Sequence, residues 1–79
     1  MEKYPVAAFA LVLRRLRHDR LLTQEELGFL AGLQRKHISA LELADKQPSL
    51  STVFRLASAL NIRPSRLIEL TEAIGNSTS

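Results

Sequence analysis

A short polar segment, Gln-Arg-Lys-His-Ile-Ser-Ala, carries the side chains best suited to recognising another molecule through hydrogen bonds. Its candidate contact residues are Gln34, Arg35, Lys36, His37, Ser39 and Ala40. In the first turn of a helix, Arg35 and Lys36 can reach guanine O6 and N7, and Gln34 can reach adenine or a phosphate. If this helix lay in the major groove of DNA, Ser39 and Ala40, one turn on, could contact a thymine methyl or simply admit the groove wall, and His37 would face a phosphate at the groove edge. The alternative is an ordinary exposed pair of cations.

The sequence offers little for catalysis or metal binding. His18 and His37 are isolated on different elements and lack metal-ligand spacing such as His-Glu-x-x-His. Asp19 beside His18 is best interpreted as a surface pair, and neither a Cys nor a Gly-rich phosphate loop is present. We therefore expect no enzymatic activity, no metal site and no cofactor.

Length and composition predict a single small domain. A chain of 79 residues with 46% hydrophobic content can bury one core but not two. We place the domain at residues 5–74 and expect the small, polar residues 75–79 to form a disordered tail. The longest apolar run, residues 5–13, is about half of a membrane span. Together with the absence of Cys, this favours a protein of the reducing cytoplasm, without membrane insertion or export.

The net charge of +3 is unevenly distributed along the chain. Residues 1–40 hold seven Lys and Arg against four Asp and Glu, whereas residues 41–79 hold four against four. A basic half that includes the polar segment suits a polyanionic partner. The alternative is a solvated cationic surface that serves only solubility.

Local signals place the polar segment on the second of two short helices. Thr23 and Glu26 have the spacing of a capping box, so a helix begins there. Gly32 is suited to end it in the left-handed conformation. The next helix, from about residue 35 to 43, turns Ile38 and Leu41 inward and leaves the polar side chains outside.

Three further helices are expected around this pair. The first runs from Pro5 to about residue 19, the fourth is capped by Ser49 after Pro48, and the fifth runs from Pro64 to about residue 73. Asn61 is a suitable left-handed residue at the end of the fourth helix. No segment shows the alternation of a strand. The fold class is therefore all-α, a compact bundle of five helices.

The order and spacing of several residues follow the sequence pattern of a known protein family. They are Arg17, Thr23-Gln24-Glu25-Glu26-Leu27, Gly32, Ile38-Ser39, Glu42, Pro48-Ser49-Leu50 and Leu56-Ala57-Ser58-Ala59-Leu60. With this order and spacing, residues 9–68 resemble the phage Cro/repressor-type (XRE-like) helix-turn-helix family. The resemblance implies a lambda-repressor-like bundle that binds a palindromic operator in double-stranded DNA as a homodimer, with the second motif helix in the major groove.

The resemblance also implies roles for individual residues. Gln24 would meet a phosphate with the help of the helix N-terminus. Arg17 and Glu42 would form a partly buried ion pair that locks the first helix to the third. Lys46 is a candidate phosphate contact in the following loop, although Ala44-Asp45 stands where a Gly and a basic residue are common and weakens that contact.

The fifth helix suggests how two copies would pair. The core needs one apolar stripe from this helix, which Leu67 supplies with Leu70 or Ile74. Ile68, together with Ile62 or whichever of the others faces outward, is then left over, far from the polar segment. We expect a homodimer through this helix; the alternative is that these side chains only cap the small core.

Phe29 and Leu30 depart from the family pattern, because they occupy positions that are normally polar. We expect one of them to tuck against the N-terminal helix and the other to be exposed, and the sequence does not decide which. They support a rival function, in which the bundle is a protein-interaction module or an antitoxin-type binder of a toxin or other protein partner.

Overall fold

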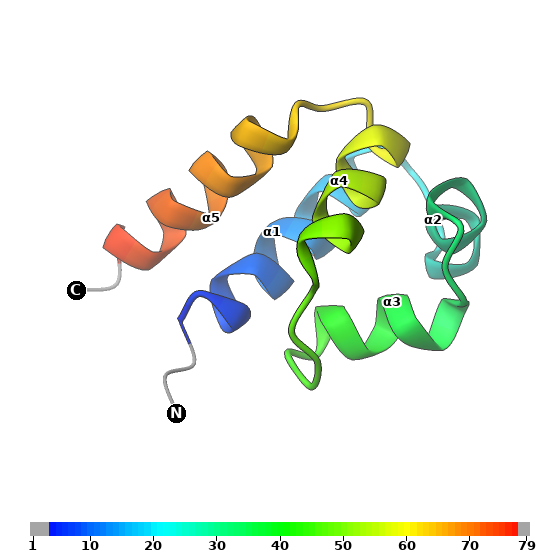
Figure 1. Ribbon diagram of the computed structural model, residues 1–79, viewed down its shortest axis with the longest axis horizontal. Coiled ribbons are helices and arrows are strands. Elements are labelled where there is room, and N and C mark those ends of the chain that lie inside the picture. The colour runs from blue at the N-terminus through cyan, green and yellow to red at the C-terminus, as the bar shows by residue number, and fades with distance from the viewer. Residues whose placement is uncertain (1–3, 78–79) are drawn as a thin grey trace.

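A computed structural model describes residues 4–77 of the chain as five helices, and no strand occurs among these residues. The helices are α1 (Val6–Asp19), α2 (Gln24–Ala31), α3 (Arg35–Glu42), α4 (Leu50–Ala59) and α5 (Pro64–Ser77) (Figure 1). The predicted all-α class is thus confirmed. No helix within residues 4–77 has the length and apolarity needed to cross a membrane.

The helix starts follow local hydrogen bonds that the sequence predicts. Thr23 Oγ1 accepts from the Glu26 backbone N–H at 3.0 Å, and the Glu26 carboxylate accepts from the Thr23 N–H at 2.9 Å. The Ser49 hydroxyl oxygen accepts from the Thr52 N–H at 3.1 Å at the start of α4. Each bond satisfies a backbone donor that has no partner within its own helix, so these caps fix where α2 and α4 begin.

The first four helices end in the same way, in a left-handed residue. These residues are Leu21 (φ 56°), Gly32 (φ 71°), Ala44 (φ 60°) and Asn61 (φ 56°). After each one, the next backbone N–H bonds back to a carbonyl five residues earlier, as for Asp45 to Ala40 at 2.9 Å. Gly32 and Asn61 were expected in this conformation. Leu21 and Ala44 also adopt the left-handed conformation. This is unusual, because the Cβ of such a residue comes too close to the following carbonyl oxygen.

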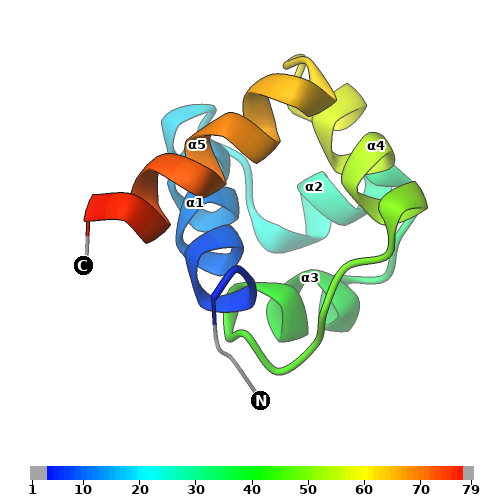
Figure 2. The same ribbon diagram turned by 60° about the vertical axis from the view of Figure 1, so that its left-hand side comes forward.

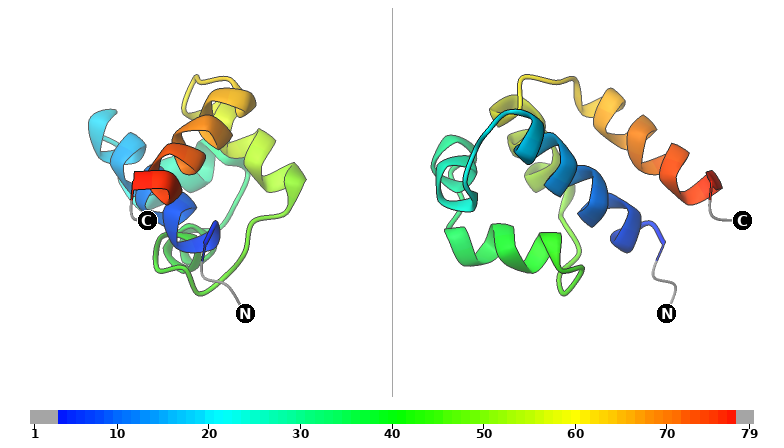
Figure 3. Two further views of the ribbon diagram at one scale, coloured as in Figure 1. Left: turned by 90° about the vertical axis from the view of Figure 1, so that its left-hand side faces the viewer. Right: turned by 180° about the vertical axis from the view of Figure 1, so that it is seen from behind.

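The helices enclose one core. Its fully buried members come from all five helices or their ends: Leu13, Leu27, Ile38, Leu41, Leu56, Leu60 and Leu67. α1 and α5 pack side by side and run in opposite directions (Figures 1 and 3), whereas α2 packs mainly against α3 and α4. As a result, α3 lies on the opposite side of the bundle from α5 (Figures 1 and 2).

The expectation that Phe29 or Leu30 tucks against the N-terminal helix is wrong. Phe29 is 85% exposed and Leu30 is 54% exposed. The physical reason is the packing of α2, whose buried face, Leu27, Gly28 and Ala31, is directed toward α3 and α4 rather than toward α1. Both apolar side chains therefore remain on the surface.

The C-terminal end differs from the expected disordered tail, because α5 continues through residues 75–77. Residues 78–79 of that expected tail lie outside the described residues. A Cβ added at Gly75 would overlap the ring of Tyr4, so the aromatic ring lies directly against the α5 backbone at this glycine. Local propensity alone predicts an earlier end of α5, and the contact with Tyr4 lies in the part of the helix beyond that end.

Candidate nucleic-acid interface

α3 presents the predicted recognition residues on its outward face. Ile38 and Leu41 are fully buried and fix the helix to the core. On the other face, Gln34, Arg35 and Lys36 are exposed, and His37, Ser39 and Ala40 are partly exposed. Gln34 is the N-cap residue and its side chain makes no capping hydrogen bond. The polar segment therefore projects from a helix whose other face is packed into the core, and this helix begins with two cations.

The turn between α2 and α3 depends on a glycine. A Cβ at Gly28 would lie 2.6 Å from the Leu33 carbonyl oxygen, a separation that real Cβ atoms essentially never show. The Leu33 N–H in turn donates to the Gly28 carbonyl at 2.8 Å. This close approach holds the start of α3 against α2 and fixes the relative orientation of the two helices.

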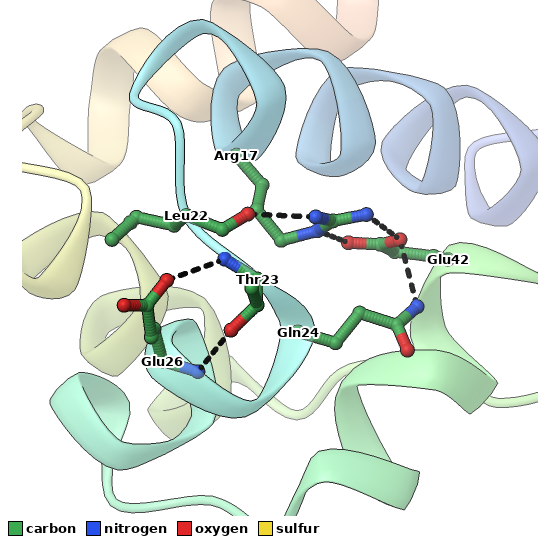
Figure 4. A network of polar contacts seen from close by, with 6 residues as sticks. All are labelled: Arg17, Leu22, Thr23, Gln24, Glu26 and Glu42. Carbon is green, nitrogen blue, oxygen red and sulfur yellow. Dashed lines mark hydrogen bonds and ion pairs between the residues drawn. The ribbon is translucent and has the colours of Figure 1, made fainter.

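Arg17 and Glu42 form an ion pair between α1 and the end of α3 (Figure 4). Arg17 Nε donates to Glu42 Oε2 at 2.6 Å, and Arg17 Nη2 donates to Glu42 Oε1 at 3.0 Å. Arg17 Nη1 also donates to the Leu22 carbonyl at 2.8 Å. The two side chains are 11% and 4% exposed. The bidentate geometry and the burial tie α1, the α1–α2 loop and α3 to one another.

The pKa of Arg17 reflects this environment. The hydrogen bond to Glu42 raises the pKa of the guanidinium above its ordinary value, burial lowers it, and the charge of Glu42 raises it again. The net shift is upward, so the Arg17 guanidinium stays positively charged in the folded protein.

Gln24, the first residue of α2, makes a contact that sequence reasoning missed. Its Nε2 donates to Glu42 Oε1 at 3.1 Å, so the same carboxylate oxygen accepts from both Arg17 and Gln24 (Figure 4). No local pattern signals this bond, because the two residues are 18 positions apart and meet only when α2 and α3 pack.

The candidate contact residues fall into two groups at opposite ends of α3. Gln24 lies beside Glu42, the last residue of that helix, whereas Arg35 and Lys36 lie in its first turn. Lys46 is exposed in the loop after α3. Among residues 4–77, no group of three or more His, Cys, Asp or Glu side chains could hold a metal ion.

The structure matches part of the expected division of apolar side chains around the fifth helix, because Ile68 is exposed but Ile62, offered with it as left-over surface, packs against the core. Leu67 is fully buried, and Ile62, Leu70 and Ile74 are partly buried against the core. Ile68 is 49% exposed on the outer face. An exposed isoleucine is thus present on the side of the bundle away from α3.

Comparison with known proteins gives consistent matches. A family model described as helix-turn-helix matches residues 13–67. An uncharacterized HTH-type transcriptional regulator, y4dJ of Sinorhizobium fredii, is 34% identical over 58 residues, which cover 73% of this chain and 75% of that protein. The crystal structure of the restriction-modification controller protein C.AhdI from Aeromonas hydrophila is 39% identical, with a TM-score of 0.76 over 78% of this chain and 94% of that one.

A further solved structure shares the fold at lower identity. It is the tetramer of the restriction-modification controller protein C.Esp1396I in complex with its natural 35 base-pair operator. Its TM-score is 0.84 over 92% of this chain and 96% of that chain, at 19% identity. At this identity the likeness extends to the fold alone.

Proposed function

Because the chain belongs to the helix-turn-helix family, we propose that it is a sequence-specific, double-stranded DNA-binding transcriptional regulator with the architecture of a repressor. The observation that carries the proposal is the outward face of α3, where Gln34, Arg35 and Lys36 are exposed on a helix held rigidly by its buried face. A rigid helix with exposed basic residues in its first turn suits the major groove.

The candidate residues take different roles in this proposal. Arg35 and Lys36 read guanine edges, and Gln34 reads adenine or meets a phosphate. Ser39 and Ala40 line the groove, where a larger side chain would hold α3 away from the bases. Contacts to the phosphate backbone come from Gln24, His37 and Lys46, and these contacts fix the position of α3 without specifying sequence.

We propose that two copies bind together. One recognition helix reads about four or five base pairs, and each good base contact discriminates by about 1–3 kcal/mol. A single copy of the domain therefore cannot select one site in a genome. The exposed Ile68 on α5, away from α3, suits a two-fold contact that sets two recognition helices about 34 Å apart. C.Esp1396I, a controller protein of the same fold, binds its operator as a tetramer, so this fold is compatible with several copies on one DNA site.

A second candidate function is protein binding, as in an antitoxin that holds a toxin or another partner. The exposed pair Phe29 and Leu30 favours it, because adjacent large apolar side chains on a small domain suit a protein contact. We give DNA binding precedence because it accounts for the exposed face of α3. We assign no enzymatic activity, since the family is one of DNA-binding regulators, and we propose a cytoplasmic location, where such a regulator meets DNA.

The proposal is tested by selecting bound duplexes from a random pool and measuring their affinities by fluorescence anisotropy at one fixed salt concentration. We expect enrichment of an inverted repeat whose half-sites are one helical turn apart, and tighter binding to it than to a scrambled duplex of the same composition. Equal affinity for all duplexes would contradict a sequence-specific regulator. The absence of binding would favour the protein-binding alternative.

A further inference from the structure

The carboxylate of Glu42 is shared between two side chains that have different expected tasks. It accepts two hydrogen bonds from Arg17, at 2.6 and 3.0 Å, and a third from Gln24 at 3.1 Å. Its side chain is 4% exposed. An ion pair that served only to lock α1 to α3 would be complete with the two bonds from Arg17. The third bond reaches the residue assigned to the phosphate contact.

The bond to Glu42 fixes which way round the Gln24 amide lies. An ionised carboxylate can only accept hydrogen bonds, whereas a Gln amide has a nitrogen that donates two and an oxygen that accepts. With the amide reversed, its oxygen would face the carboxylate oxygens and the hydrogen bond would become a repulsion. Figure 4 shows the amide nitrogen of Gln24 directed at Glu42 and the amide oxygen directed away from it.

We propose that Glu42 is a positioning residue for the DNA contact of Gln24, an inference that rests on the proposed function. A phosphate, like a carboxylate, only accepts hydrogen bonds. Glu42 engages one Nε2–H of Gln24, so the second Nε2–H is the donor offered to the phosphate. The side chain is held in the free protein in the orientation that the contact needs, and less side-chain freedom is lost on binding.

Arg17 makes this arrangement compatible with DNA. An uncompensated carboxylate next to a phosphate contact would repel the backbone, but the guanidinium of Arg17 neutralises Glu42 at direct contact. Arg17 also holds the Leu22 carbonyl, immediately before the capping box that opens α2. The pair therefore fixes both the start of α2 and the side chain at its first position.

A double-mutant cycle separates positioning from a purely structural role. Glu42→Gln keeps the shape of the side chain and an acceptor for Arg17, but its own amide no longer dictates the orientation of Gln24. The affinity for several duplexes is measured by anisotropy at fixed salt for the wild type, Glu42→Gln, Gln24→Ala and the double variant. Each variant is checked by circular dichroism and urea unfolding, so that affinities are compared only between folded proteins.

We expect Glu42→Gln to weaken binding roughly two- to ten-fold relative to the wild type, by a similar factor for every duplex, because one immobilised side chain loses its orientation. In the Gln24→Ala background, Glu42→Gln should change the dissociation constant by less than about two-fold. A difference of that size is within the error to which the effects of independent substitutions add. The loss of unfolding free energy should persist in both backgrounds, because the bond to Arg17 is weakened in each.

Removing a negative charge near DNA would itself raise affinity, so a charge-matched control is needed. Glu26 lies in the first turn of α2, as Gln24 does. Glu26→Gln removes one negative charge there and leaves an oxygen that can accept from the Thr23 N–H. We expect it to bind the same duplexes at least as tightly as the wild type. If Glu26→Gln and Glu42→Gln weaken binding equally, the effect of Glu42 is not specific to Gln24 and the inference fails.

A measurement on the wild type alone tests the hydrogen bond even if Glu42→Gln does not fold. The side-chain amide protons of Gln24 are followed by nuclear magnetic resonance, with those of the exposed Gln34 and Gln47 as internal references. We expect at least one Gln24 proton to be shifted and to exchange with water more slowly than the references. Protons indistinguishable from those of Gln34 and Gln47 would overturn the inference.

The remaining outcomes separate this inference from the proposed function. A wild type that binds no duplex refutes the proposed function itself. A wild type that binds, with Glu42→Gln acting by the same factor in the presence and absence of the Gln24 amide, refutes only the positioning role and leaves Glu42 as a structural partner of Arg17.

Discussion

The left-handed residue at the end of α3 gives a direct prediction about stability. Ala44 has φ 60° and is exposed, so its Cβ contributes conformational strain without burying apolar surface. Ala44→Gly removes only this one carbon. We expect the substitution to stabilise the protein.

The expected magnitude follows from two opposing effects. The left-handed conformation costs a residue with a Cβ about 1–2 kcal/mol, which Gly avoids. Gly also gains conformational freedom in the unfolded chain, which offsets about 0.5–1 kcal/mol of that gain. The net increase in unfolding free energy is about 0.5–1 kcal/mol, equivalent to a rise in Tm of about 2–8 °C for a domain of this size.

The assay is urea unfolding followed by circular dichroism, in which the midpoint should rise while the m-value stays unchanged. Ala73→Gly is the matched control, since Ala73 is also exposed but lies within α5, where the right-handed conformation favours Ala. The added freedom of the unfolded chain is the same in both variants. The control should lose about 0.5–1 kcal/mol of unfolding free energy. Opposite signs therefore isolate the conformational preference of the folded state.

The reasoning would be refuted if Ala44→Gly lost as much stability as Ala73→Gly. That result would mean that Ala44 is not held in the left-handed region in solution, and that the bond from the Asp45 N–H to the Ala40 carbonyl does not end the helix there.

Three other predictions test different parts of the molecule. Arg35→Ala should cost about 1–3 kcal/mol of binding free energy on the preferred duplex and little on random DNA, measured by anisotropy; equal losses on both would show a phosphate contact only. Arg17→Met should lower the unfolding free energy by about 3 kcal/mol, because it leaves Glu42 buried without its partner, whereas Arg66→Met in the exposed pair on α5 should cost at most about 0.5 kcal/mol. If Arg17→Met lost as little unfolding free energy in urea as Arg66→Met, the predicted cost of leaving Glu42 without its ion-pair partner would be wrong. Ile68→Glu should convert a dimer to a monomer in sedimentation equilibrium, and a wild type that is itself monomeric at micromolar concentration contradicts the proposed pairing.

Much of the fold was predictable because its signals are local. The capping pair Thr23 and Glu26 and the residues Gly32 and Asn61 each act within one helical turn, so their effect does not depend on the rest of the chain. The same holds for the buried face of α3, which follows from the spacing of its apolar residues. These features gave the all-α class and the positions of the helices.

The candidate site was predictable only in part. The exposed first turn of α3 follows from its sequence, because polar residues at its start cannot be buried without partners. The partnership of Arg17 and Glu42 was expected from the resemblance rather than from periodicity, since no local signal joins residues 25 positions apart. The roles of these residues toward DNA stay predictions until binding is measured.

The sequence by itself determined where α2 and α4 begin and which stripe of each helix is apolar, because capping bonds and backbone preferences act over a few residues. Only the tertiary structure decided that Phe29 and Leu30 both face solvent, that α5 continues beside Tyr4, and that Gln24 shares the carboxylate of Glu42. Each of these depends on which helices pack together and at what angle, and packing is set by the whole core at once rather than by any one segment.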